Sequence, residues 1–402
     1  MSIRNNYKHT LTASYFGYIT QAIVNNFAPL LFVTFQRSFG ISLEKIAGLV
    51  TVNFCLQLFI DFFSAKFIDR IGYRVSIVAA HLFAGAGLIM LGTLPSALPD
   101  PYIGLLISIA VYAVGGGLIE VLISPIVEAC PTDKKSAAMS LLHSFYCWGH
   151  VAVILLTTLF FVTAGIENWR LLACLWAVIP FANAVYFCLV PINSLAAEGE
   201  SAPMKQLFTS KLFWILAVLM VCSGASEQAM SQWSSAFAET GLKVSKTVGD
   251  LLGPCMFAVL MGLSRVLYAA FSERIKLTSF IRASCIMCVA GYLTAAFAPH
   301  PVLALAGCGI CGFSVGILWP GVFSLAAKYS RNGATAMFAL LALAGDLGCA
   351  SGPALVGAVS GAFGDDLKAG FLAAIAFPVL LVAGIIILER IKPKNANNIK
   401  GR

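Results

Sequence analysis

Ala65-Lys66-Phe67-Ile68-Asp69-Arg70-Ile71-Gly72-Tyr73-Arg74 forms a short charged turn between two long apolar segments. A related turn, Glu273-Arg274-Ile275-Lys276, follows about half of the 402-residue chain later. Each turn lies between the second and third long apolar segment of its half. A charged turn repeated at matching places in two apolar halves predicts a duplicated six-span bundle, an arrangement typical of transporters.

The composition places the chain in a membrane. Hydrophobic residues make up 59% of it and charged residues 11%, whereas a soluble domain has about 25% charged residues. Runs of roughly 20 apolar residues can cross a ~30 Å hydrocarbon core, and none alternates with the period of a β-barrel strand. We expect twelve transmembrane helices, near residues 10–35, 44–67, 75–95, 102–126, 136–164, 168–190, 211–238, 247–270, 278–298, 302–327, 333–362 and 368–389.

The predicted fold is an all-α integral membrane protein made of two pseudo-symmetric six-helix bundles. The first bundle covers residues 1–190, and the second covers 212–402 with a short basic tail. A polar stretch, 191–211, is expected to link them in the cytoplasm.

The net charge of +8 comes from an uneven distribution of basic residues and predicts no nucleic-acid partner. Most of the 26 Lys and Arg residues lie in segments on the side of the termini. The positive-inside rule therefore predicts cytoplasmic N- and C-termini, as an even number of spans requires. We expect a multi-pass protein of the cell (plasma or inner) membrane, surrounded by the lipid bilayer.

Two cysteine pairs have the spacing of a zinc ribbon, Cys285-x-x-Cys288 and Cys308-x-x-Cys311. Both pairs fall inside apolar helices, so we interpret them as small packing residues. No metal and no cofactor are predicted.

Polar side chains inside spans are costly and need a reason. In span 1, Gln21 and Asn25 lie on one helical face, with Asn26 beside them, and in span 2 Asn53 and Gln57 share a face. These amides either bridge neighbouring helices or line a cavity. His143 and Tyr146 lie on one face of span 5. For each histidine of that span, His143 and His150, we expect a hydrogen-bonded packing role.

Buried carboxyl groups are the strongest functional candidates. Glu120 and Glu227 lie well inside their spans with no Lys or Arg within a helical turn. Removal from water favours the neutral acid and allows proton exchange. Asp346 serves either helix packing or coupling. Asp61 lies nearer the cytoplasmic end, which favours gating or structural pairing over solute contact.

The basic residues Lys66 and Arg265 are expected near cytoplasmic helix ends, where they can snorkel. Without a cation at mid-depth, the solute is expected to be neutral or cationic. Amides pair with hydroxyl groups, and aromatic rings stack on sugars. The substrate-binding candidates are Gln21, Asn25, Asn26, Asn53, Gln57, Glu120, His143, Tyr146, Glu227, Gln228, Gln232, Trp233 and Trp319. The proton-coupling candidates are Glu120, Glu227 and Asp346, and the gating candidates are Asp61, Asp69, Arg70, Arg74, Glu273 and Arg274.

The segment from Ala65 to Arg74 resembles the loop motif of the major facilitator superfamily, G-x-x-x-D-R-x-G-x-R, with Ala65 in place of the first glycine. The stretches 117–125 and 316–326 are similar to motifs of the fucose and glucose/galactose permease group, with Ser124 and Trp319 replacing the usual Asn and Phe. The resemblance implies that Glu120 lies in a sugar cavity and takes part in proton coupling. The fucose carrier's cavity Asp in span 1 is absent here, which argues against fucose itself.

These observations together favour a secondary active transporter, not an enzyme. We expect it to move a small neutral polar solute, a sugar or sugar derivative, by alternating access and proton symport, with sodium as the other possible coupling ion. The partners expected are this solute and the coupling ion, and the carrier is expected to be a monomer. The alternative is proton antiport that exports amphipathic compounds or drugs. The span-4 arginine and the span-5 G-x-x-x-G-P motif of drug antiporters are absent, and Gly149 is followed by His150.

Overall fold

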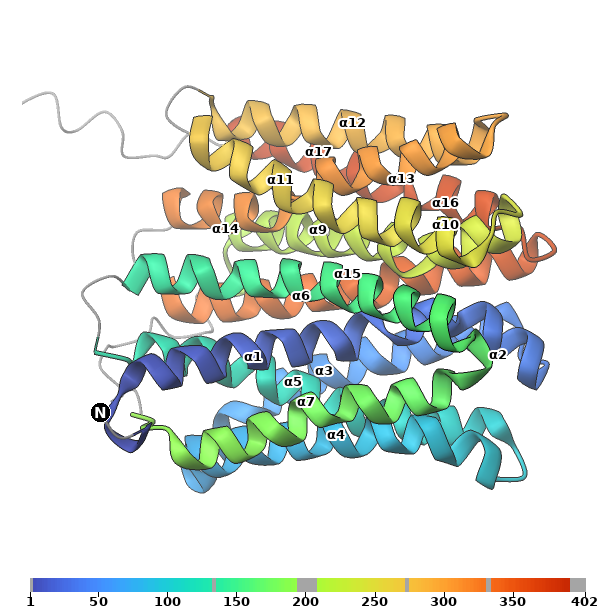
Figure 1. The fold of residues 1–402 in the computed structure, drawn as a ribbon. Helices are drawn as coiled ribbons and strands as arrows, with labels where there is room; N and C mark the ends of the chain where they lie inside the picture. Colours follow the sequence, from blue (N-terminus) through green and yellow to red (C-terminus); the bar gives the residue numbers. More distant parts are fainter. Residues whose placement is uncertain (1–2, 132–134, 194–207, 272–274, 330–333, 391–402) are drawn as a thin grey trace, which may run out of the picture.

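The computed structural model describes residues 3–131, 135–193, 208–271, 275–329 and 334–390. Within these ranges the secondary structure is helical, and twelve segments are long and apolar enough to cross a membrane. The long helices run side by side (Figure 1). The predicted all-α fold with twelve spans is confirmed.

The first half of the chain supplies six spans. A short turn, η1 (Ile3–Asn5), precedes the first span, and η3 (Ile166–Asn168) precedes the sixth. The first span is built from α1 (Tyr7–Asn26), η2 (Ala28–Leu31) and α2 (Phe32–Phe39). The others are α3 (Leu43–Ile71), α4 (Tyr73–Ala97), α5 (Pro101–Glu128), α6 (Lys135–Ala164) and α7 (Trp169–Leu189).

The second half supplies the other six spans, four of which are built from more than one helical piece. They are α9 (Lys211–Ala236) with η4 (Phe237–Gly241), α10 (Lys246–Asp250) with η5 (Leu251–Cys255) and α11 (Met256–Phe271), α12 (Leu277–Phe297), α13 (Pro301–Val315) with α14 (Leu318–Tyr329), α15 (Ala334–Ala362), and α16 (Leu367–Ala374) with α17 (Ala376–Arg390).

Prolines account for several of the interruptions inside spans, because a proline removes an N–H donor and clashes with the preceding turn. Pro29 lies in η2, Pro254 in η5, and Pro378 just after the junction of α16 and α17. Pro320 follows the break between α13 and α14. The turn of the opening motif depends on Gly72, whose φ of 89° joins α3 to α4 in a conformation that favours glycine.

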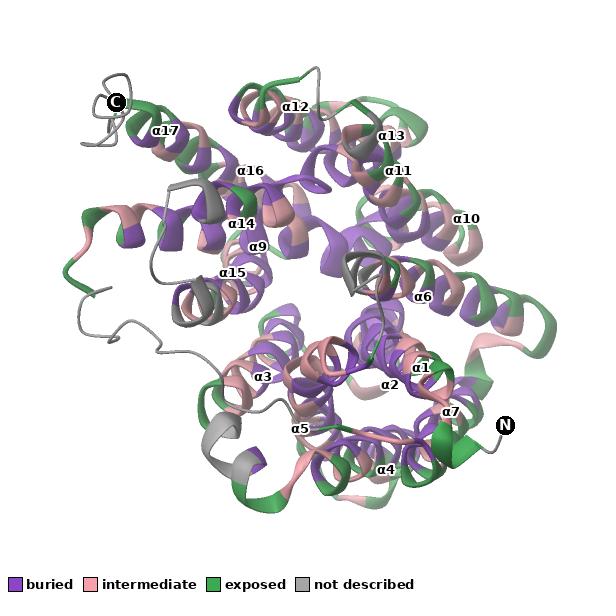
Figure 2. Cartoon of the chain, turned by 90° about the vertical axis from the view of Figure 1, so that its left-hand side faces the viewer, coloured by how far each residue is buried: buried purple, intermediate pink, exposed green. Residues whose placement is uncertain are grey.

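The spans pack into two groups. In the first half α4 lies against α5 and α7, and α1 lies against α5 and α6; in the second half α9 lies against α15 and α17, and α13 against α11 and α12. The groups meet where α3 packs on α15 and α6 packs on α11. Figure 2 views them along the helices, with the exposed residues mostly on the outer faces. The prediction of two six-helix bundles is confirmed.

Contacts between the halves close the end of the molecule away from the chain termini. The Phe32 and Trp233 rings lie 5.3 Å apart, and the Arg37 guanidinium lies 2.8 Å from a Glu239 carboxylate oxygen. Gly357 of α15 lies against Ala47 of α3 and beside the same Trp233 ring. Small residues and rings thus seal this end by close packing.

Candidate functional site

A cavity of about 160 Å³ lies between the two halves at the level of the predicted polar residues. Eight helices contribute to its wall, four from each half. The lining residues are Tyr18, Gln21, Asn25, Phe54, Gln57, Glu120, Tyr146, Glu227, Gln228, Arg265, Trp319, Asp346 and Cys349. Many of the polar positions that the sequence distributes over separate spans are therefore brought to one place.

Amide side chains of α1 and α3 form a continuous network on one side of this cavity. Gln21 Nε2 donates to Gln57 Oε1 at 3.0 Å and to Glu120 Oε2 at 3.1 Å. Gln57 Nε2 donates to Asn25 Oδ1 at 2.8 Å, and Asn53 Nδ2 donates to the same oxygen at 3.2 Å. These amides both bridge helices and, at Gln21, Asn25 and Gln57, face the cavity.

Three carboxyl groups from three helices converge beside this network. Asp61 of α3, Glu120 of α5 and Asp346 of α15 each offer an oxygen, and the three oxygens lie within 4.8 Å of one another. The Asp61 and Asp346 carboxyls are hydrogen-bonded to each other. A hydrogen bond between two carboxyl groups needs a proton, because two carboxylates can only accept.

This carboxyl cluster joins the two halves, since Asp61 and Glu120 belong to the first and Asp346 to the second. Three oxygens are a partial ligand set for an oxygen-preferring cation, and they are also acceptors for protons. From the sequence, gating was predicted for Asp61 and proton coupling for Glu120 and Asp346. The structure brings all three together.

Residues of α9 form the opposite wall. Gln228 Nε2 donates to Glu227 Oε1 at 3.3 Å, and both residues line the cavity. Gln232 Nε2 donates to Gln228 Oε1 and to the Asn25 carbonyl oxygen, each at 3.1 Å. Gln232 and Asn53 line a much smaller neighbouring space. Trp233 lies outside the cavity wall, buried against Phe32 with its N–H donated to the Pro353 carbonyl oxygen at 3.0 Å.

The aromatic candidates of spans 5 and 10 reach the cavity. The Tyr146 hydroxyl is hydrogen-bonded to the Asn25 and Asn26 side chains, and Trp319 lines the wall supplied by α14. Asn26 also donates to the Ala22 carbonyl oxygen at 2.9 Å. His150 is buried beside this region, whereas the side chain of His143 lies outside the described residues.

Arg265 was not among the predicted site residues, and it lines the cavity. Its Nε donates to the Gly316 carbonyl oxygen at 3.0 Å and its Nη1 lies 3.2 Å from Cys147 Sγ. In an unbroken helix the Gly316 carbonyl would bond the N–H of residue 320, but Pro320 has none. The expectation that Arg265 only snorkels at a helix end is wrong, because its side chain turns inward to this freed carbonyl.

The model of the Major Facilitator Superfamily matches residues 14–353. The chain belongs to the Major Facilitator Superfamily. The Rhizobium meliloti "Membrane protein MosC" is 25% identical to this superfamily member over 329 residues, covering 82% of this chain and 77% of that protein.

Solved superfamily structures share the fold. A bacterial homologue of the human lysosomal transporter Spinster, in an inward-facing and occupied conformation, matches with a TM-score of 0.77 and 14% identity over 95% of this chain and 97% of its own. The nucleoside transporter NupG matches with a TM-score of 0.75 and 13% identity, over 96% of this chain and 100% of its own. A variant of the Escherichia coli fucose:proton symporter FucP matches with a TM-score of 0.65 and 16% identity, over 94% of this chain and 98% of its own. At these identities the likeness shows the fold alone.

Two of the gating candidates, Arg70 and Arg74, are absent from the lining of the cavity. Arg74 Nη1 donates to the Phe187 and Cys188 carbonyl oxygens at 2.7 and 3.1 Å, which ties α4 to the end of α7 within the first half of this superfamily member. Arg70 is exposed. The Asp69 side chain, together with Glu273 and Arg274, lies outside the described residues.

Proposed function

We propose that this transporter carries a small, hydroxyl-rich, neutral solute, a sugar or sugar derivative, together with protons in the same direction. The observation that carries the proposal is the direct contact between a solute-facing amide and the carboxyl cluster, Gln21 Nε2 to Glu120 Oε2 at 3.1 Å. Amides present both donors and acceptors, which hydroxyl groups can satisfy. A solute bound to Gln21 therefore lies next to the groups that can hold the coupled proton.

The charges in the cavity wall support a neutral solute on new grounds. Arg265 supplies a fixed cation in the wall, which corrects the expectation that no cation lies at mid-depth. The same wall carries the carboxyl groups of Glu120, Glu227 and Asp346. Acidic groups thus outnumber the guanidinium, which disfavours an anionic solute. Tyr146 and Trp319 add ring surface that suits the apolar face of a sugar.

The proposed cycle uses the carboxyl cluster as the link between proton and solute. When Glu120 is protonated, its hydroxyl can donate a hydrogen bond to a solute oxygen. When Asp61 and Asp346 share a proton, their hydrogen bond holds the two halves together across the cavity. Loss of these protons leaves like charges close together, and their repulsion favours separation of the two halves. The loaded, protonated carrier is then the species that reorients.

The first test replaces Glu120 with glutamine, which mimics the neutral acid permanently. Glu120→Gln should keep solute binding and counterflow exchange but abolish accumulation driven by a pH gradient. A sugar panel screened by thermal shift on purified wild-type protein supplies the probe for uptake into proteoliposomes. Glu227→Gln is the matched control, because it removes a carboxyl from the same cavity but outside the cluster.

Three outcomes of this test would contradict the proposal in different ways. Uphill accumulation by Glu120→Gln but not by Glu227→Gln would assign the proton to the other acid. Accumulation that needs sodium, and is lost when choline replaces it, would make sodium the coupling ion. Export of amphipathic compounds without any sugar hit would favour the drug-antiport alternative.

We also propose that both termini are cytoplasmic and that residues 191–211 link bundles 1–190 and 212–402 on that side. Single cysteines at His300 and at Glu200, in a cysteine-depleted background, should react with an impermeant maleimide from opposite sides of the membrane. Labelling of both positions from the same side would contradict this topology.

A further inference from the structure

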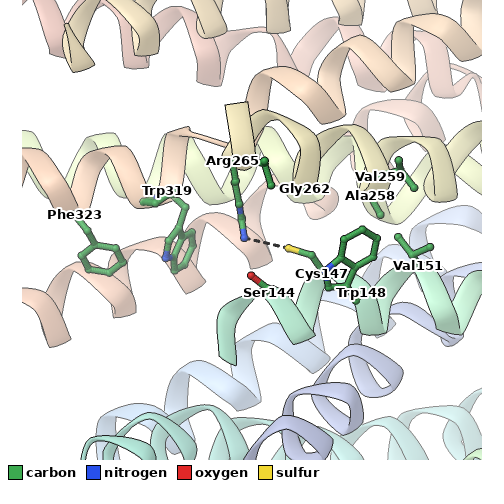
Figure 3. Close-up of a pocket in the computed structure, with 12 residues that line it drawn as sticks. Ser144, Cys147, Trp148, Val151, Ala258, Val259, Gly262, Arg265, Trp319 and Phe323 are labelled. Carbon is green, nitrogen blue, oxygen red and sulfur yellow. Dashed lines mark hydrogen bonds between the residues drawn. The ribbon is translucent and has the colours of Figure 1, made fainter. Parts of the chain in front are cut away.

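A second cavity lies beside the first and is larger, at about 390 Å³. It lies between α6 of the first half and α11 of the second, with Trp319, Pro320 and Phe323 of α14 also in its wall, and we call it the α6–α11 crevice (Figure 3). Its volume falls in the range of about 300–1,000 Å³ that is typical of sites for drug-sized ligands. Arg265 and Trp319 line both this crevice and the solute cavity.

The outer edge of the α6–α11 crevice faces the hydrocarbon of the bilayer. Trp148 and Val266, one on each side, are each 63% exposed, and both lie inside membrane-spanning segments. Side chains exposed at this depth contact lipid, not water. An occupant of the crevice would therefore enter from the membrane.

The inner end of the crevice is charged, although most of its wall is apolar. Among its lining residues Arg265 alone carries a formal charge. The Glu227 carboxyl interacts electrostatically with this guanidinium but lines only the solute cavity. The guanidinium spans the gap from α11 to Cys147 Sγ of α6 at 3.2 Å. With five N–H donors, a guanidinium can hold a carboxylate and keep its bonds to Gly316 and Cys147.

Gly262 leaves the crevice open on the α11 side. A Cβ built on this residue meets no atom within 4 Å. A larger side chain here would extend into the crevice without displacing a neighbour, so the space can be filled by a single substitution.

We propose that the α6–α11 crevice binds a single-chain anionic amphiphile of the fatty-acid type from the surrounding bilayer. The alkyl chain lies between α6 and α11, where apolar side chains and Trp148 contact it, and the carboxylate lies at Arg265. Because the crevice is bounded by both halves, an occupant restrains their relative movement and acts as an inhibitor of transport. This inference goes beyond the proposed solute and does not depend on it.

Binding can be measured without knowing the solute. The carrier is placed in phosphatidylcholine nanodiscs and titrated with a medium-chain alkanoate brominated at its terminal carbon, whose bromine quenches tryptophan fluorescence on contact. The matching brominated alkanol is the neutral probe. The wild-type carrier should bind the alkanoate about tenfold more tightly than the alkanol, as one charge-assisted hydrogen bond implies.

Four variants separate the crevice from general partitioning into lipid. Gly262→Leu should weaken both probes at least tenfold, and Gly262→Ala should weaken them less. Arg265→Gln should remove the preference for the alkanoate and leave the alkanol unaffected. Ala182→Leu, which adds the same bulk on the exposed face of α7, should behave as wild type. Thermal unfolding of each variant verifies that it is folded.

Equal affinity for the two probes in the wild-type carrier would overturn the proposal, as would quenching that Gly262→Leu leaves unchanged. Efficient cross-linking of two carriers through Trp148→Cys would instead assign this face to contact between copies and would also overturn it.

Discussion

At the scale of single residues, Arg265 joins three parts of the molecule. Its guanidinium satisfies the Gly316 carbonyl that Pro320 leaves unpaired in span 10, and it reaches Cys147 in the other half. It also lines both cavities. One side chain therefore stabilises a broken helix and connects the halves at the level of the cavity between them.

Arg265→Lys should lower the stability of the folded carrier, because the compact ammonium cannot reproduce the planar fork that bonds Gly316 and Cys147 together. We expect a loss of about 1–2 kcal/mol, the size of one or two hydrogen bonds to a charged group. A lower midpoint of thermal unfolding in detergent measures it, with Arg170→Lys on the surface of α7 as control. An unchanged midpoint would mean that the Gly316 carbonyl is satisfied without the guanidinium.

The sequence predicted much of the site, because helical spacing fixes which polar residues share a face. Gln21, Asn25 and Gln57 were chosen in this way, and Glu120 was chosen as a carboxyl group deep in its span. All four line one cavity. Arg265 was missed because position along a span indicates depth but not the direction of a long side chain. The contact of Asp61 with Asp346 was missed because it crosses the two halves, and no local spacing reports such a contact.

At the scale of helices, α9 and α15 approach each other through small residues. Gly348 and Gly352 of α15 lie directly on the backbone of α9 at Val221 and Ala225. Close backbone approach of this kind is how membrane helices gain packing energy, since lipid offers no hydrophobic driving force between them. The pair holds Asp346 of α15 and Glu227 of α9 in the same wall.

Gly348→Ala should destabilise the carrier by about 1–3 kcal/mol, because the added methyl group collides with the Val221 carbonyl oxygen and forces α15 away from α9. Gly262→Ala is the matched control, since its methyl group enters open space and helix propensity alone would make it neutral or stabilising. Thermal unfolding of both proteins decides the matter. Equal midpoints would show that α15 can move away from α9 without loss of stability.

The presence of each transmembrane helix was predictable from the length of its apolar segment, but the breaks within the helices were not. The sequence predicts span 10 near residues 302–327 as one segment, whereas the structure ends α13 at Val315 and begins α14 at Leu318. A proline inside an apolar run can kink a helix or break it, and the outcome depends on which neighbouring group satisfies the freed carbonyl. Here that group is Arg265, from a different span.

At the scale of the whole molecule, packing closes one end while the acids lie deeper between the halves. Gly357 against Ala47, and Phe32 against Trp233, seal the end away from the termini. Alternating access requires this seal to break and re-form in each cycle. Small residues suit that task, because they allow close approach without long interlocked side chains.

Gly357→Leu should hold this end open, since its side chain would collide with Ala47 of α3 and with the Trp233 ring. A cysteine introduced at Thr51, on α3 within the same contact region, should then react several-fold faster with an impermeant maleimide. Ala182→Leu, on the exposed face of α7, is the control for added bulk. Unchanged labelling of Thr51→Cys would mean that the seal does not depend on this contact.

The Arg37–Glu239 ion pair at the sealed end makes reorientation sensitive to the salt concentration of the medium. Arg37 is 69% exposed while Glu239 is 10% exposed, so dissolved ions reach one partner freely. The Debye length falls from about 10 Å at 0.1 M to about 3 Å at 1 M, and an exposed pair contributes only ~0.2–1 kcal/mol. Concentrated electrolyte bathing this end therefore speeds its opening by no more than about fivefold, through the ionic strength alone and without any ion being carried.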